Sequence, residues 1–282
     1  MRLRRPFIVQ AVNDAANCSG SEDVCGWKYT LGGLHIWVID GATSIAADPY
    51  HMSATDTDPA WFAGSFSAEL RRSARFNPIT SIDIERILRT LRVRWSAGGG
   101  KNVPVCDWPI AAMAYVFVCK TGGGYRLTTL RYADCTYAIH NVPTWIRAPA
   151  RVKVIYPSRA REPRAPFAGL DATVVDHLRI RREQQIIENV SSALTLNPQS
   201  AFTGARAVLH ANPRRLGFCA SDGFERLWSR YKVRSVNEVI RNLAFKRMDA
   251  EFLRLRAHER DRKVAYADKK CDDACAVSFY LP

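Results

Sequence analysis

The chain has 282 residues, of which 47% are hydrophobic and 24% are charged. These values are ordinary for a folded protein, so the composition does not favour an intrinsically disordered chain, and the length suits one large domain or two small ones. Lys and Arg outnumber Asp and Glu by 41 to 27, which gives a formal net charge of +14. This charge favours acidic partners, among them phosphorylated segments, nucleic acid and membrane surfaces, without selecting one.

Membrane insertion and disulfide bonding are both disfavoured by the sequence. No stretch reaches the roughly 18 uninterrupted apolar residues of a membrane span. The apolar run near the N-terminus is broken by Gln10 and Asn13, which is not typical of a signal peptide. The eight cysteines are scattered and form no C-x-x-C pair. We therefore expect a cytoplasmic protein with reduced, structural cysteines, with a zinc site as the alternative.

The first 40 residues predict three strands and a loop that carries acids. The strands are expected at residues 7–12, 27–31 and 34–39. Gly32 and Gly33 separate the last two strands, so we expect a hairpin there. The adjacent acids Glu22 and Asp23 lie in the loop that precedes this hairpin.

Two helices are expected next. The first covers residues 59–76 and has a proline near its start. The second follows Thr80 or Ser81, either of which is a suitable N-cap. Its apolar residues repeat at i, i+3, i+4 and i+7, namely at Ile84, Ile87, Leu88 and Leu91. Its arginines take the other side, which is more typical of a solvated face than of a nucleic-acid-binding surface.

The middle of the chain predicts a block of strands followed by a helix. The strands are expected at residues 110–118, 126–132 and 135–140. Residues 143–166 are rich in Pro and Arg and lack apolar periodicity, so we expect a surface excursion with one short strand at 152–156. Residues 171–196 predict a helix with one or two apolar stripes.

The C-terminal part predicts strands at residues 216–220 and 276–281, and a helix that begins within 224–231. A capping box at Ser235 and Glu238 indicates the start of another helix. No internal repeat and no shift in composition divides the chain, so we expect residues 1–282 to form a single domain. The order of strands and helices favours an α+β layered domain over a series of βαβ units.

Acidic residues lie at the ends of several predicted strands. They are Asp40, Asp134, Asp222 and Asp272, with Glu22 and Asp23 in a loop. If these strands are neighbours, the carboxylates would repel one another at a cost of about 1 kcal/mol or more per pair. Cations remove this cost, and an all-oxygen ligand set favours Mg²⁺ or Mn²⁺ over zinc. The alternative is that Asp40 and Asp222 only cap turns.

The same acids carry a resemblance to a known family. Five motifs follow one another along the chain: Ser21-Glu22-Asp23, Val38-Ile39-Asp40-Gly41, Ala133-Asp134-Cys135, Ala220-Ser221-Asp222-Gly223 and Asp272-Asp273-Ala274-Cys275-Ala276-Val277. Their order and spacing resemble those of the metal-dependent type 2C serine/threonine protein phosphatases of the bacterial type. The resemblance spans residues 22–281 and implies a four-layer αββα sandwich, with two central antiparallel sheets flanked by helices.

The resemblance also implies the roles of the acids around two Mn²⁺ or Mg²⁺ ions. Asp40 would bridge the two ions, and the carbonyl oxygen of Gly41 would ligate one of them. Asp222 and Asp272 would complete the site of the other ion. Asp134 matches the acid that, with Asp222, holds a third and weaker metal.

Glu22 and Asp23 match the acids that orient metal-bound water in this family. Two departures concern other positions. Ala42 follows Gly41 where the family often has a histidine that is a proposed general acid. Cys18 replaces the arginine that grips the substrate phosphate in many members, and the available basic substitutes are Lys28, Arg4 and Arg5.

We interpret the chain as a Mg²⁺- or Mn²⁺-dependent serine/threonine phosphoprotein phosphatase that hydrolyses phosphomonoesters through a water activated by two metals. The expected partner is a phosphorylated protein in signalling, without nucleic acid or membrane, and the sequence leaves the oligomeric state open. The alternative is a weak or inactive relative that uses the same fold as a phosphoprotein- or effector-binding module. A nucleic-acid-binding protein is the third candidate.

Overall fold

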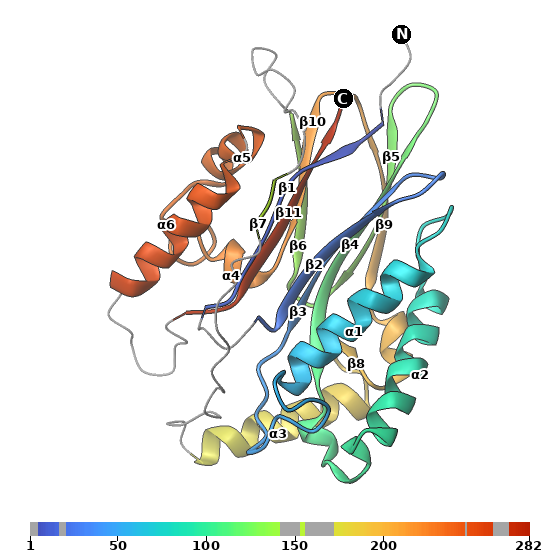
Figure 1. Cartoon of the computed structure of the whole chain (residues 1–282), viewed down its shortest axis with the longest axis vertical. Helices are drawn as coiled ribbons and strands as arrows, with labels where there is room; N and C mark the ends of the chain where they lie inside the picture. The colour runs from blue at the N-terminus through green and yellow to red at the C-terminus, as the bar shows by residue number, and fades with distance from the viewer. Residues whose placement is uncertain (1–4, 17–20, 142–152, 156–171, 246, 262–270) are drawn as a thin grey trace.

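Two β-sheets lie face to face at the centre of the molecule, and helices cover their outer faces (Figure 1). The computed structural model describes residues 5–16, 21–141, 153–155, 172–245, 247–261 and 271–282. Sheet A contains, in order, β6 (Thr136–Asn141), β10 (Arg215–Ala220), β11 (Ala274–Leu281), β1 (Phe7–Asp14) and β7 (Lys153–Ile155). Sheet B contains β2 (Asp23–Tyr29), β3 (Leu34–Gly41), β4 (Ile110–Lys120), β5 (Tyr125–Tyr132) and β9 (Ala205–Ala211), and the short β8 (Leu194–Thr195) pairs with β4.

The helices form the two outer layers. Sheet B is covered by α1 (Asp58–Ser73) and α2 (Ser81–Ala97), and sheet A by α5 (Val236–Ala244) and α6 (Met248–Asp261) (Figure 1). The remaining helices are α3 (Ala172–Ile187), the short α4 (Asp222–Glu225) and the 3₁₀ turns Gly100–Asn102, Val105–Asp107 and Pro198–Phe202. The predicted α+β four-layer αββα sandwich is therefore confirmed. No described helix is both long and apolar enough to cross a membrane.

The apolar run of β3 explains how sheet B sits between two other layers. Ile36 and Val38 face sheet A and share a core with Phe279 of β11. Trp37 and Ile39 point to the opposite side, into the core beneath α1 and α2. Successive side chains of a strand alternate between its faces, so a strand that is buried on both sides has apolar residues at almost every position.

Capping and packing residues explain where the helices begin. Thr80 and Asp83 form a capping box at the start of α2, and Ser235 and Glu238 form another at the start of α5. The apolar positions predicted for α2 are all buried. The predicted short strand near residues 152–156 is β7, which pairs in parallel with β1, whereas the other strand pairs are antiparallel. The rest of the expected surface excursion, residues 143–166, lies outside the described residues.

Four elements differ from the sequence-based expectation. The strand expected at 27–31 is β2, which begins at Asp23 and ends at Tyr29, so Asp23 lies in a strand and not in the expected loop. The helix expected over 171–196 ends at Ile187, because the chain turns through Asn189 at φ 53° and then forms β8 against β4. The edge strand β9 has no apolar alternation and is mostly exposed, so its pattern gives no strand signal. The helix α6 buries Glu251 and Glu259 among its apolar residues, which obscures its amphipathic pattern.

A buried histidine joins β3 to β4 and to the segment after α1. His35 is fully buried, its Nε2 lies 2.8 Å from the carbonyl oxygen of Arg75, and its Nδ1 lies 2.8 Å from the hydroxyl of Tyr115. The carbonyl oxygen only accepts, so Nε2 carries the proton and Tyr115 donates to Nδ1, while its oxygen accepts from the amide of Ile79 at 2.9 Å. Burial lowers the pKa of His35 to about 4.

We predict that His35 makes the protein less stable as the pH falls. The unfolded chain takes up a proton near pH 6.5 and the folded chain only near pH 4, so stability is lost between these values. The difference corresponds to about 3 kcal/mol. The free energy of unfolding, obtained from urea denaturation at several pH values between 7.5 and 4, measures this loss of stability. His35→Gln should flatten this dependence, whereas His210→Gln, at an exposed position of β9, should leave it unchanged. An identical slope in the wild type and His35→Gln would contradict the assignment.

Candidate metal centre

The predicted site residues lie at one end of both sheets. In sheet B, Asp23 at the start of β2 is the register partner of Asp40 near the end of β3. In sheet A, Asp222 lies two residues after the end of β10, as the first residue of α4, and Asp272 lies two residues before β11. These two strands run antiparallel, so the end of one meets the start of the other. The packing of the two sheets then brings both pairs of acids together.

Five of the seven predicted residues line one pocket of about 240 Å³. They are Asp40, Gly41, Asp134, Asp222 and Asp272. The remaining walls come from the segment after β3, the start of β4 and the helix α3, which contributes Gln185. Asp134 is exposed, in the turn between β5 and β6. Acids from both sheets therefore share one solvent-accessible cavity.

Glu22 and Asp23 are buried and are not among the residues that line this pocket. Glu22 accepts a hydrogen bond of 2.8 Å from the hydroxyl of Thr57, the N-cap of α1, and its amide donates to Asp273 at 2.7 Å. One carboxylate oxygen of Asp23, Oδ2, is buried and has no hydrogen-bond partner. Glu22 is thus fixed by its surroundings, while Asp23 keeps an unsatisfied acceptor.

The acids raise one another's pKa values. Burial, followed by the carboxylate of Asp273, raises the pKa of Asp23 well above its usual value. Burial also raises the pKa of Asp40 strongly, with Asp23 and Asp222 adding to the effect. The pKa of Asp222 is raised by burial and by Asp272, although Arg226 opposes the shift. The end of the two sheets therefore concentrates more negative charge than the described cations neutralise.

Two glycines allow the backbone segments of the site to approach closely. A Cβ on Gly41 would lie 2.7 Å from the carbonyl oxygen of Glu22, and one on Gly223 would lie 1.9 Å from that of Asp273. Neither distance is possible for a real side chain. The Asp-Gly sequences at Asp40 and Asp222 are thus required by packing between segments that are distant in the sequence.

Two arginines that no predicted motif includes contact Asp272, one through its carboxylate and the other through its carbonyl oxygen. Nη2 of Arg226 lies 2.5 Å from Asp272 Oδ2 and 3.8 Å from Asp222 Oδ2. Arg256 of α6 donates to Asp14 Oδ2 at 2.9 Å and to the carbonyl oxygen of Asp272 at 2.7 Å. The position of Arg226, four residues after Asp222 at a helix start, is the one sequence signal that could have indicated its contact.

The donor set fits hard divalent cations chemically, although the acids are not arranged as a finished coordination shell. Within the described residues, no group of three or more His, Cys, Asp or Glu side chains is positioned to hold a metal ion as it stands. The carboxylate of Asp272 contacts Arg226 instead. The unpartnered oxygen of Asp23 and the raised pKa of Asp40 nevertheless indicate a deficit of positive charge that oxygen-preferring ions would fill.

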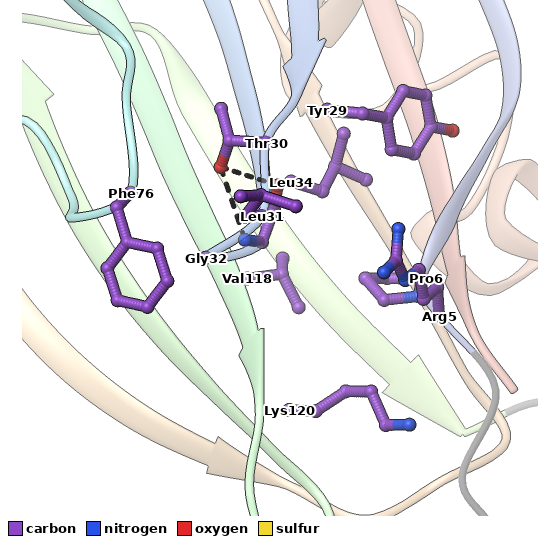
Figure 2. Close-up of a pocket in the computed structure, with 11 residues that line it drawn as sticks. Arg5, Pro6, Tyr29, Thr30, Leu31, Gly32, Leu34, Phe76, Val118 and Lys120 are labelled. Carbon is purple, nitrogen blue, oxygen red and sulfur yellow. Dashed lines mark hydrogen bonds between the residues drawn. The ribbon is translucent and has the colours of Figure 1, made fainter.

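Two of the basic residues considered as substitutes for the missing arginine, Lys28 and Arg5, lie far from the acids. Lys28 donates to the carbonyl oxygens of Arg71 and Ala74 at the C-terminus of α1, both at 2.8 Å. Arg5 lines a separate pocket of about 280 Å³ at the β2–β3 hairpin (Figure 2). The hairpin is the end of β2 and β3 opposite to Asp23 and Asp40. Arg4 and Cys18 lie outside the described residues.

Arg182 of α3 lies nearer to the acids. Burial lowers the pKa of its guanidinium to about 10, against the opposing influence of Asp107 and Glu22. Gln185, three residues further along the same helix face, lines the pocket of the acids. Arg179, three residues earlier, forms an ion pair of 3.5 Å with Asp107, and this pair joins the same face of α3 to the 3₁₀ turn Val105–Asp107. No local pattern in the sequence distinguishes Arg182, because its position beside Glu22 depends on where α3 packs.

Seven cysteines are described, and the four buried ones do not resemble nucleophiles. All seven are free, and four of them are buried, namely Cys25, Cys135, Cys219 and Cys275. Burial raises the pKa of each of these four thiols, to about 12 for Cys25. A thiol with a raised pKa is a poor nucleophile at neutral pH. The prediction of reduced, structural cysteines agrees with these observations.

We predict that Asp23→Asn stabilises the metal-free protein. Its folded-state pKa is raised, so ionisation of Asp23 at neutral pH works against folding, and a neutral amide removes that penalty. The melting temperature in EDTA at pH 7.5 should rise by at least about 2 °C, the shift that about 1 kcal/mol produces in a chain of this size. Asp134→Asn, at an exposed position, should change it little. A lower melting temperature for Asp23→Asn would refute this account.

Comparison with known proteins gives a likeness in structure alone. No family model and no curated protein sequence matches the chain. The serine/threonine phosphatase Stp1 from Staphylococcus aureus aligns with a TM-score of 0.55 at 11% identity, over 100% of this chain and 97% of that chain. PppA from Pseudomonas aeruginosa aligns with a TM-score of 0.53 at 12% identity, over 99% and 98%.

The serine/threonine phosphatase of S. agalactiae aligns with a TM-score of 0.52 at 10% identity, over 97% of this chain and 98% of that chain. These alignments run through all four layers, because they cover nearly the whole of each chain. At such low identity the likeness establishes the arrangement of the elements rather than the activity. The chain has the fold of the bacterial type 2C serine/threonine phosphatases.

Proposed function

We propose that this protein is a Mg²⁺- or Mn²⁺-dependent phosphatase that removes phosphate from serine or threonine residues of phosphoproteins. The observation that carries the proposal is the meeting of Asp40 from sheet B with Asp222 and Asp272 from sheet A in one accessible pocket. The raised pKa values of Asp40 and Asp222 support it, since they reflect carboxylates that lack enough positive charge.

The residues that would hold the ions are those at the pocket wall. Asp40 is suited to both ions, Gly41 offers its carbonyl oxygen, and Asp222 and Asp272 complete the second position. Asp134, exposed at the rim, would serve a third and weaker ion together with Asp222. When bound, two such ions would activate a water and stabilise the charge that develops on the phosphoryl group.

The surrounding residues of the chain would position water and substrate. Glu22, held by Thr57 and Asp273, and Asp23, with its unsatisfied oxygen, would orient water beside Asp40. Arg182 would supply the cation that contacts the substrate phosphate, the role left open by Cys18. The net charge of +14 would favour the approach of acidic phosphorylated segments.

A catalytically weak or inactive binding module is the second candidate. The contact between Arg226 and Asp272 favours it, because this ion pair occupies a carboxylate that would bind a metal ion in an active phosphatase. Ala42 at the pocket wall also favours it, because the type 2C phosphatases, which this chain resembles, often have a histidine at this position. An inactive module would bind phosphorylated proteins without turnover.

We predict that hydrolysis of p-nitrophenyl phosphate requires added Mn²⁺ and is abolished by EDTA. Asp40→Asn should lower kcat by about a thousandfold, because a shared carboxylate is lost from the ion site. Asp134→Asn should lower turnover while the number of tightly bound ions stays the same, because it contacts only the weaker third position. Steady-state kinetics and calorimetric Mn²⁺ titration of the three proteins measure both effects.

Full phosphatase activity after exhaustive chelation would refute the hypothesis that hydrolysis depends on a metal ion. Normal turnover by Asp40→Asn would show that the acids are not the active site. Metal binding without hydrolysis of an aryl phosphate or of a phosphothreonine peptide, combined with binding of that peptide, would favour the inactive module.

We also predict that Arg182→Gln raises KM for the aryl phosphate by about tenfold and changes kcat less, because a charge-assisted contact to the phosphate is lost. Arg181→Gln is the matched control, since Arg181 is the exposed neighbour on α3 and carries the same charge. Equal KM values for the two variants would exclude Arg182 as the phosphate contact.

A further inference from the structure

We infer that Arg226 is a built-in cation that stands in for one divalent ion beside Asp222 and Asp272, so that a second ion binds only by displacing it. This inference rests on the proposed function and concerns the regulation of the same site. The centre would therefore fill in two separate steps, a tight first ion on the Asp40 side and a weaker second ion.

The contacts of Arg226 are those expected of a resident counter-ion. Its Nη2 lies 2.5 Å from Asp272 Oδ2 and 3.8 Å from Asp222 Oδ2, which are the two carboxylates assigned to the second ion. The Arg226 side chain is 11% exposed, so little water screens this charge pair. A charge-assisted hydrogen bond in such a setting is among the stronger polar contacts in a protein.

The backbone around Arg226 is fixed. Its amide donates to the carbonyl oxygen of Asp222 at 3.0 Å, and its own carbonyl oxygen accepts from the amide of Tyr231 at 2.7 Å. The neighbouring side chains of Phe224 and Leu227 are fully buried in the core beneath α5 and α6. Displacement of the guanidinium must therefore occur by rotation of the side chain, because the backbone is held on both sides.

Asp272 is held from two directions. Arg226 contacts its carboxylate, while Arg256 donates to its carbonyl oxygen at 2.7 Å. Arg256 is itself held by Glu259 at 2.6 Å. Asp272 is thus already oriented and neutralised by side chains of the protein before any ion binds.

The two halves of the pocket consequently differ in charge compensation. On the sheet B side, the buried Oδ2 of Asp23 has no hydrogen-bond partner, and Asp23 lies opposite Asp40 in the register of β2 and β3. On the sheet A side, Arg226 compensates Asp222 and Asp272. A first divalent ion gains most where compensation is lacking. A second ion must break the contact between Arg226 and Asp272, which we expect to weaken its binding by about tenfold or more.

This arrangement would make activity depend on metal concentration in a stepwise manner. At low Mn²⁺ the protein would hold one ion and would still have the Arg226–Asp272 pair intact. At higher Mn²⁺ the second ion would compete with the guanidinium for Asp222 and Asp272. The same chain would then be a one-ion binding protein or a two-ion hydrolase according to the available metal.

The test is calorimetric titration of Mn²⁺ into the wild type, Arg226→Gln and Arg226→Lys, with native mass spectrometry to count the ions. The wild type should show one tight ion and a second that binds at least about tenfold more weakly. Arg226→Gln should bind the second ion at least about tenfold more tightly than the wild type. Arg226→Lys retains the charge and should keep the stepwise pattern. Arg241→Gln, an exposed change of equal charge on α5, should behave as the wild type.

Thermal melting provides a readout that is independent of turnover. In EDTA, Arg226→Gln should melt at a lower temperature than the wild type, because Asp272 loses its counter-ion, and it should gain more on addition of Mn²⁺. If this variant does not stay folded without metal, the ions retained after dialysis of Mn²⁺-loaded protein give the same comparison.

The outcomes separate the two proposals. Two ions of equal affinity in the wild type, or an unchanged second affinity in Arg226→Gln, would overturn the role of Arg226 and leave the phosphatase proposal intact. Behaviour of Arg226→Lys identical to that of Arg226→Gln would also overturn it, because the charge would then be irrelevant. Failure of every protein to bind Mn²⁺ would overturn the proposed function itself.

Discussion

The contact between sheet A and sheet B is the constraint on which the rest of the molecule depends. Asp40 lies on a strand of sheet B and Asp222 lies two residues after β10 of sheet A, so their carboxylates meet only when the two inner faces pack together. That packing comes from apolar residues such as Val38 and Phe279, which share the central core. The hydrophobic effect thus brings together groups that repel each other, and burial of apolar surface offsets the repulsion.

The repulsion among the acids is relieved at some carboxylates and not at others. The hydroxyl of Thr57 donates to Glu22, an arginine faces Asp272, and one oxygen of Asp23 has no partner. A protein selected only for stability would not bury an unpartnered carboxylate oxygen, because the cost of desolvating it is not recovered. Locally unfavourable groups of this kind are typical of functional sites, where a ligand completes the interactions.

The fold is shown by structural likeness, whereas the activity is proposed from individual side chains. The alignments to solved phosphatases extend over nearly the whole chain at 10–12% identity, which supports a common arrangement of layers. Function resides in the particular side chains that a fold presents. Here the acids of the five motifs are present, whereas Ala42, Arg226 and Arg182 are features of this chain. These three positions are therefore the ones that the proposed chemistry makes most important to test.

The sequence by itself determined most strands, the capped starts of α2 and α5, and the acids that lie at strand ends, because alternation, capping and turn signals are local. It did not determine the end of α3, the edge strand β9 or the helix α6, whose patterns depend on strand pairing and on ion pairs within the helix. Only the tertiary structure placed Lys28 and Arg5 far from the acids and brought Arg226 onto Asp272, a residue 46 positions away. Contacts between distant segments follow from how the layers pack, and no local pattern encodes that packing.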